Sequence, residues 1–326
     1  MRAKTELLCR SRQRGERLTS GKNDRTHYYL SLGFIITTVL FWGFSFISTK
    51  IVLADIPPST IAFLRQIISI IVLLPWVLHS LRGSGGAQLR AVSWKDFALV
   101  ALSGMFGIVL YFVFENNGLR YTTAANASMI VAAVPIFTLF TEAAFFKLKI
   151  TWWMVACLVL SIFGVYLVVS GSGRLDFSSA SFKGNMLVMG AMACWVGYTI
   201  VNKRLTHKYS SMLLTFSQAL VSIFMFIPFI IPEAGQWRVP SGAALGHLIY
   251  LGVCCSALGY IFYVYAVKRL GATVTASFLN LIPVITVACG CLLLKETVSM
   301  VQMVGMGLIL ASLYVISFLK SGDRAV

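Results

Sequence analysis

Glu115-Asn-Asn-Gly-Leu-Arg-Tyr-Thr-Thr-Ala-Ala-Asn126 is the stretch that decides how this chain folds. It places a carboxylate inside an apolar segment, turns at Arg120 to Thr123, and continues through small residues to Pro135. Polar groups inside hydrocarbon are costly and are usually retained because they line a pathway. A related stretch ends at Pro283, 148 residues after Pro135, so the quoted stretch is one half of a pair.

The composition indicates a membrane protein. Of the 326 residues, 58% are hydrophobic and 12% are charged, whereas soluble domains carry about 25% charged residues. Repeated apolar runs of roughly 20 residues match the thickness of a bilayer. A large soluble helical protein would need polar helix faces, which are absent here. The net charge of +16 lies mainly between the apolar runs, so it does not predict binding of nucleic acid.

Ten apolar segments predict an all-α polytopic membrane protein with ten transmembrane helices. They span about residues 30–53, 59–79, 96–118, 122–146, 152–170, 183–203, 210–231, 244–267, 271–293 and 299–319. We expect residues 1–29 to form a disordered basic tail and residues 320–326 to form a second tail. Most of the 27 Lys and Arg residues fall on the side of the N-terminus. The positive-inside rule therefore predicts cytoplasmic termini and a plasma (bacterial inner) membrane location.

An internal repeat divides the chain into a first half (residues 30–170) and a second half (residues 183–319), joined by a linker (residues 171–182). At an offset of 153, Trp42 falls on Trp195 and Arg65 falls on Gln218. At an offset of 148, Pro135 falls on Pro283. Five spans per half is an odd number, so the second half must enter the membrane from the opposite side. Such inverted repeats are typical of transporters, with the substrate site near the midplane between the halves.

The chain resembles the EamA-type family of the drug/metabolite transporter superfamily. The resemblance rests on motifs that occur in the same order in both halves and covers about residues 30 to 319. They are Trp42-Gly43-Phe44-Ser45-Phe46, Lys50, Arg65 after Pro57-Pro58, Glu115 to Ala124, Pro135, Arg269-Leu270-Gly271-Ala272, Pro283 and Lys295-Glu296. The resemblance implies ten helices in two inverted five-helix bundles around a central cavity, and movement of small metabolites or drugs, often by export.

The charged residues within the predicted spans are the first candidates for a site. Lys50, Arg65 and Glu115 all lie in the outer parts of spans. An unpaired charge at a helix centre costs about 2.5–3.5 kcal/mol on insertion scales, so we expect a mutual ion pair or network. The pair is either a gate or coupling site, with Glu115 as a proton carrier, or a fixed structural salt bridge. The second half lacks charged counterparts of Arg65 and Glu115, with Gln218 and Tyr263 in their places, which favours a function.

Further candidates are polar or aromatic residues within the spans. Trp42, Trp195, Tyr198 and Tyr260 line a cavity or serve as packing aromatics, and Gln218 is the counterpart of Arg65. Asn126 and Asn280 lie near the paired prolines, and a buried amide needs partners. Pro135 and Pro283 each remove a helical hydrogen-bond donor, so we expect a kink or hinge at both.

These features predict a secondary transporter that exports small metabolites or drugs by alternating access, rather than an enzyme. The sequence shows no catalytic set, and neither a cofactor nor a metal is predicted, because the seven cysteines lack metal-ligand spacing. The expected partners are a small solute, with proton coupling left open, and the lipid bilayer, for a monomer or a homodimer. The alternatives are a membrane-embedded enzyme acting on lipid-linked substrates, or a receptor or scaffold that does not transport.

Overall fold

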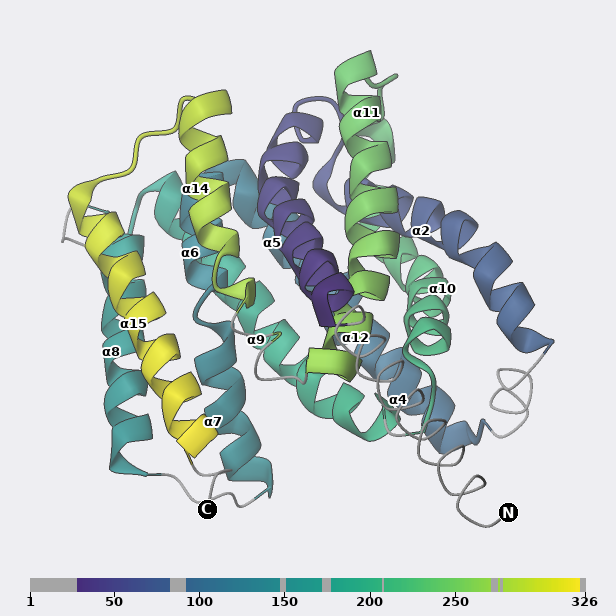
Figure 1. Cartoon of the computed structure of the whole chain (residues 1–326). Helices are drawn as coiled ribbons and strands as arrows, with labels where there is room; N and C mark the ends of the chain where they lie inside the picture. Colours follow the sequence, from purple (N-terminus) through teal and green to yellow (C-terminus); the bar gives the residue numbers. More distant parts are fainter. Residues whose placement is uncertain are drawn as a thin grey trace, which may run out of the picture.

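The computed structural model describes residues 28–82, 92–146, 151–171, 177–206, 208–270, 275 and 278–322, and within them it is helical without strands (Figure 1). The helices, in chain order, are Tyr28–Val52, α2 (Pro58–Leu81), α4 (Trp94–Gly104), η1 (Met105–Leu110), α5 (Tyr111–Tyr121), α6 (Ala124–Val131), α7 (Val134–Phe146), α8 (Trp152–Ser170), α9 (Ala180–Thr206), α10 (Ser211–Ile230), η2 (Ile231–Gln236), α11 (Gly242–Tyr250), η3 (Leu251–Leu258), α12 (Gly259–Leu270), α14 (Ile282–Leu293) and α15 (Met300–Gly322). Of the predicted tails at residues 1–29 and 320–326, residues 1–27 and 323–326 lie outside the described residues. Residues 28–29 and 320–322 belong instead to the first helix and to α15, so the helices extend further than predicted at both ends.

The helices confirm a multi-pass membrane protein. Among the described residues, seven helices are long and apolar enough to cross a membrane. Three further apolar helices are shorter: Ala124–Thr138, Ile282–Leu293 and Met300–Val315. Helix occupies part or all of each of the ten predicted segments, and within the described part of the chain seven helices meet both the length and the apolar composition of a span. The ten-span architecture and the inverted relation of the halves therefore stay predictions.

Local sequence explains where several helices begin. Ser93 and Asp96 form a capping box at the start of α4, in which the Ser93 hydroxyl accepts from the Asp96 backbone N–H. Ser241 caps α11 in the same way by accepting from the N–H of Ala244. Pro58 occupies the first turn of α2, where its missing N–H would have no helical partner.

Two helical segments, η1 and η3, have the wider π-helical winding. The stretch from α4 through η1 to α5 is one apolar rod from Trp94 to Tyr121. The stretch from α11 through η3 to α12 repeats this arrangement in the second half. At the repeat offset of 148, Gly104 before η1 corresponds to Gly252 within η3. π-helical turns inside α-helices are frequent at functional sites.

The two paired prolines differ from the prediction in one respect. We expected each proline to kink the interior of a helix, but the helix ends before it. α6 ends at Val131 and α7 begins at Val134, so Pro135 is the second residue of a new helix. Pro283 lies in the first turn of α14, after a turn at Asn280 and Leu281. Proline is tolerated at this position because its missing N–H has no helical acceptor there.

Close helix contacts hold the bundle together, and many of them join the two halves. α8 packs along α15, where a Cβ atom on Gly305 would lie 2.6 Å from the Gly164 carbonyl oxygen. α5 packs along α9 and α2 packs along α10. Figure 1 shows α8 and α15 side by side at one edge of the bundle. The halves therefore form one interleaved bundle, with its largest apolar core around α6, α8 and α9.

Candidate functional site

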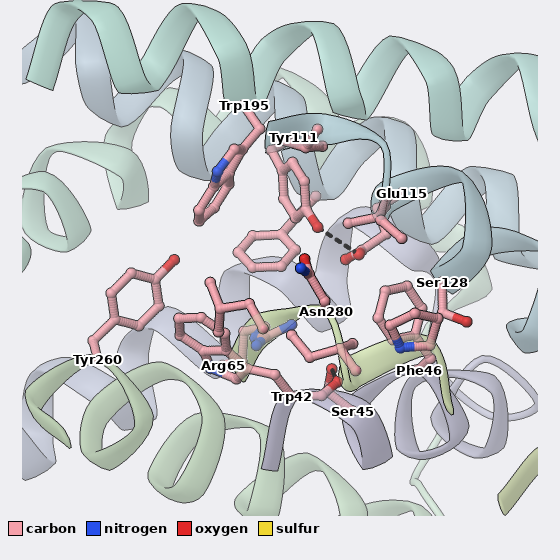
Figure 2. A pocket seen from close by; sticks show the side chains of 17 residues that line it. Trp42, Ser45, Phe46, Arg65, Tyr111, Glu115, Ser128, Trp195, Tyr260 and Asn280 are labelled. Carbon is pink, nitrogen blue, oxygen red and sulfur yellow. Dashed lines mark hydrogen bonds between the residues drawn. The ribbon is translucent and has the colours of Figure 1, made fainter. Parts of the chain in front are cut away.

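A cavity of about 150 Å³ lies among helices of both halves (Figure 2). It is lined by Trp42, Ser45, Phe46, Arg65, Tyr111, Phe112, Glu115, Ser128, Val131, Ala132, Val134, Trp195, Tyr260, Leu279, Asn280, Ile282 and Pro283. The first half contributes the buried Arg65 and Glu115, and the second half contributes aromatic and amide groups. Seven of the residues predicted from the sequence meet here: Trp42, Arg65, Glu115, Trp195, Tyr260, Asn280 and Pro283.

Arg65 projects from α2 and is only 4% exposed. Its Nε donates to the Ser256 hydroxyl at 3.0 Å, a contact from the first half to the second. Its guanidinium lies 4.2 Å from the centre of the Phe112 ring, which stabilises the cation through the ring's negative face. Among the described residues it makes no further hydrogen bond, so the Nη groups are left for whatever enters the cavity.

Glu115 projects from α5 and is 6% exposed. One carboxylate oxygen accepts a hydrogen bond from the Tyr111 hydroxyl at 2.8 Å, drawn as the dashed line in Figure 2. Tyr111 lies four residues earlier on the same helix, so the two side chains share one face. A single phenol leaves the second carboxylate oxygen without a hydrogen-bond donor from the described residues.

The predicted ion pair between the two buried charges is wrong. Within the described residues, no nitrogen of Arg65 or Lys50 lies within 4.0 Å of a Glu115 oxygen. Each charge is held by a neutral neighbour instead, Arg65 by Ser256 and Glu115 by Tyr111. Figure 2 shows both groups on the wall of the same cavity, with the Asn280 amide close by. The arrangement presents a guanidinium and a carboxyl group that do not contact each other.

Aromatic side chains form much of the remaining wall. The indole N–H of Trp42 donates to the Cys255 carbonyl at 3.1 Å, which fixes the ring orientation. The ring centres of Trp42 and Tyr260 lie 5.4 Å apart, and those of Trp195 and Tyr111 lie 5.2 Å apart. Such contacts are worth about 0.5–1.5 kcal/mol each beyond the area they bury. The wall is therefore a rigid apolar surface around two charged groups.

The two helix breaks also reach the cavity. Val131, Ala132 and Val134 line it from the break between α6 and α7. Asn280 and Ile282 line it from the turn before α14. Discontinuous helices at membrane depth occur where the backbone lines a cavity rather than lipid. The breaks thus lie where a solute could reach backbone polar groups.

Three predicted residues lie away from this cavity. Asn126 accepts from the Gln302 side chain at 2.6 Å, which ties α6 to α15. Gln218 donates to the Ser103 hydroxyl at 2.7 Å and to Asn202 at 3.0 Å, and Asn202 in turn donates to the Tyr198 hydroxyl at 3.0 Å. Gln218 and Tyr198 border a separate cavity of about 10 Å³, enough for roughly one water molecule, which shares Tyr260 with the main cavity.

Some site residues were missed, and one prediction cannot be placed. Tyr111 was not singled out, although its position one helical turn before Glu115 was a usable signal. Ser45 and Ser128 carry no pattern that separates them from other small residues in spans. The side chain of Pro135 lies outside the described part of the chain, so its position relative to the cavity stays a prediction. No group of three or more potential metal ligands exists among the described residues.

The fold and the cavity define a class of protein, a polytopic helical membrane protein with a polar site between its halves. Comparisons with known proteins then place it. The model of the EamA-like transporter family matches the chain twice, over residues 30–170 and 182–318. The chain therefore belongs to the EamA-like transporter family, and it is a membrane transporter.

Individual relatives agree with this placement. An uncharacterised transporter of Archaeoglobus fulgidus is 29% identical over 86% of this chain and 95% of its own. A protein of Streptantibioticus cattleyicolor, named a probable terminal-alkyne amino-acid exporter, is 22% identical over 89% of this chain and 94% of its own. One solved crystal structure superposes with a TM-score of 0.61 at 17% identity, over 90% of this chain and 97% of that one, a likeness that shows the fold alone.

Proposed function

We propose that this transporter exports a small zwitterionic solute by alternating access of the cavity between its two halves. The solute carries a carboxylate and an ammonium group on an apolar body. The carrying observation is the pair of buried charges, Arg65 and Glu115, which line one cavity without pairing with each other. A solute carboxylate would meet the free Nη groups of Arg65, and its ammonium would meet Glu115.

The energetics favour such a solute over a singly charged one. A solute that carries only a negative charge would bind Arg65. It would leave Glu115 as a buried charge beside a second negative group. A zwitterion supplies a partner to each charge at once and adds no net charge to the hydrocarbon region. Hydrogen bonds to charged groups contribute about 1.5–3 kcal/mol each, and an unsatisfied buried charge costs more than that.

The size and lining of the cavity support a small solute. Its volume of about 150 Å³ is below the roughly 300–1,000 Å³ of pockets that hold drug-sized ligands. The rings of Trp42, Phe112 and Tyr260 suit an apolar or aromatic body. The named amino-acid exporter among the relatives handles a solute with both charged groups, which supports this class for the present chain.

The same arrangement supports alternating access. The double match of the family model supports two homologous halves, with domain bounds near residues 30–170 and 183–319. We propose that they form ten spans of inverted topology, with both termini cytoplasmic in the plasma membrane. Rocking of the halves would expose Arg65 and Glu115 first to one side and then to the other. Coupling to protons through Glu115 belongs to the same proposal.

Solute flux in proteoliposomes tests the proposal. Liposomes that contain the purified protein are loaded with leucine or phenylalanine. Parallel samples contain the amide of each amino acid, in which the carboxylate is replaced, or the corresponding acid without the amine. We expect the zwitterions to move at least about tenfold faster than either analogue, since each analogue loses one charged contact. A pH gradient across the liposomes then reports proton coupling. Equal rates for all analogues, or no flux of any zwitterion, would contradict the proposal.

A further inference from the structure

Two glutamates of the second half bind the backbone at the starts of two helices in the first half. Glu233, in η2, accepts from the backbone N–H groups of Ser59 at 2.9 Å and Thr60 at 2.8 Å. It also accepts from the Thr60 hydroxyl at 2.8 Å, and Trp237 donates to that hydroxyl at 3.0 Å. The carboxylate therefore fills the first turn of α2, which lacks a side-chain cap of its own.

Glu296 repeats this arrangement at α6. It accepts from the backbone N–H groups of Ala124 at 2.8 Å and Ala125 at 3.0 Å. The residue before it, Lys295, has a φ of 55°, a left-handed conformation that is uncommon for residues other than glycine. Such backbone strain persists only where surrounding contacts hold it. The loop after α14 is thus shaped to deliver Glu296 to the start of α6.

Both contacts lie at one end of the bundle. α5 runs toward this end, because Asn116 in its middle donates to the Pro58 carbonyl at the start of α2 at 2.9 Å. α6 begins three residues after α5 ends. In Figure 1 this end is uppermost, where α11 begins and the chain leaves α14 for α15. We call it the clamp end, and the predicted topology places it outside the cell.

The two clamped helices carry part of the cavity wall. α2 carries Arg65, seven residues or about 10 Å from its start at 1.5 Å per residue. α6 carries Ser128, and it ends at the break that lines the cavity. A displacement of either helix start therefore moves cavity residues. The carboxylates belong to the opposite half, so the contacts must adjust if the halves move apart at this end.

We propose that Glu233 and Glu296 are positioning residues that hold the cavity closed at the clamp end, and that their release opens it to that side. This inference rests on the proposed alternating access. Each carboxylate satisfies N–H groups that have no partner within their own helix. The positive end of the helix dipole strengthens such contacts, and hydrogen bonds to an ionised acceptor are about twice as strong as neutral ones.

The opposite end offers a matched comparison. There Asp96 of the first half binds Lys208 of the second, and it accepts from the Tyr209 hydroxyl at 2.9 Å. The Lys208 side chain is 49% exposed, so water weakens this link. Asp96→Asn is therefore the same chemical change, carboxylate to amide, at the end away from the clamp.

Cysteine accessibility tests the inference without any solute. Serine 128 is changed to cysteine (Ser128→Cys) in a chain whose native cysteines are replaced, and a membrane-impermeant maleimide is added from each side. We expect Glu233→Gln/Glu296→Gln to raise the labelling rate from the clamp end about tenfold, since each amide keeps one acceptor but loses its charge. Labelling from the other end stays constant or falls. Asp96→Asn does not raise labelling from the clamp end.

A labelling rate equal to the parental rate in the folded double variant, or an equal rise from both sides, overturns the inference.

If the double variant folds poorly, a protein cross-linked at the clamp end tests the inference in the opposite direction. Thr60→Cys/Glu233→Cys is bridged by a short bifunctional maleimide, and labelling of position 128 from the clamp end should then fall at least about tenfold. An unchanged rate in the bridged protein also overturns it. Neither labelling experiment needs a transported solute. Their outcome therefore does not depend on whether the flux experiments find a zwitterion that is transported.

Discussion

Gln218 stands in the second half where Arg65 stands in the first, and each donates to a serine of the opposite half. Arg65 Nε reaches Ser256 at 3.0 Å, and Gln218 Nε2 reaches Ser103 at 2.7 Å. Each donor lies seven residues after the first residue of its helix, α2 or α10. Both contacts therefore join the two halves, and their donors occupy corresponding positions of the internal repeat. Only the Arg65 contact carries charge, and it borders the main cavity, whereas Gln218 borders the cavity of about 10 Å³.

Removing either buried charge should abolish most transport without unfolding the protein. We expect Arg65→Gln and Glu115→Gln each to lower zwitterion flux about tenfold or more, because each loses one charged hydrogen bond to the solute of about 1.5–3 kcal/mol. The double variant should recover nothing, since the two side chains do not pair. Flux and folded yield are measured for both singles and the double. Recovery in the double would show that the charges pair during the cycle.

Replacing the paired prolines should slow transport and leave the fold intact. Alanine supplies the missing N–H, so the breaks before Pro135 and Pro283 can wind into continuous helix. We expect flux to fall severalfold in Pro135→Ala and in Pro283→Ala, with unchanged melting temperature. Pro228→Ala is the control, because Pro228 lies within α10 and does not line the cavity. If the first two variants transport at the parental rate, the breaks do not act as hinges.

The contact between α8 and α15 should tolerate no added methyl group. A Cβ on Gly305 would lie 2.6 Å from the Gly164 carbonyl oxygen, and backbone cannot move aside as a flexible side chain can. We expect Gly305→Ala to lower the free energy of unfolding by about 1–3 kcal/mol. Gly307→Ala, two residues along the same helix, meets nothing within 4 Å and should be neutral or stabilising. Thermal unfolding in detergent compares the two, and equal melting temperatures would contradict the packing described.

The apolar segments were predictable because hydrocarbon thickness sets their length. The segment predicted at 96–118 is the rod Trp94–Tyr121, and the one predicted at 152–170 is α8. What could not be predicted is the rotation of each helix and its distant partners. Arg65 and Glu115 were expected at similar depth, but Ser256, 191 residues away, holds the arginine. Asn126 likewise turns to Gln302, 176 residues away. Such contacts depend on packing between halves, which residue spacing does not encode.

The loop carboxylate Asp55 should stabilise the protein in a pH-dependent way. The Ser241 hydroxyl and then its backbone N–H donate to Asp55, which lowers the pKa of this carboxyl below its usual value. A lowered pKa means that the stabilisation is present above the unfolded value of about 3.9 and is lost as pH falls through the folded value. We expect the melting-temperature difference between the parent and Asp55→Asn to be constant above about pH 5 and to vanish in stronger acid. A difference independent of pH would contradict this.

The break between α6 and α7 brings both poles of the peptide backbone to the cavity wall. The negative end of the α6 dipole and the positive end of the α7 dipole meet there, although turn hydrogen bonds, such as that from the Ile136 N–H to the Ala133 carbonyl at 3.1 Å, pair several of the end groups. Val131 and Val134 border the cavity on the two sides of this junction. The cavity is therefore dipolar even without its charged side chains. A chain that lacks both Arg65 and Glu115 should still prefer an uncharged solute with a strong dipole, such as an amide, over a hydrocarbon of the same shape.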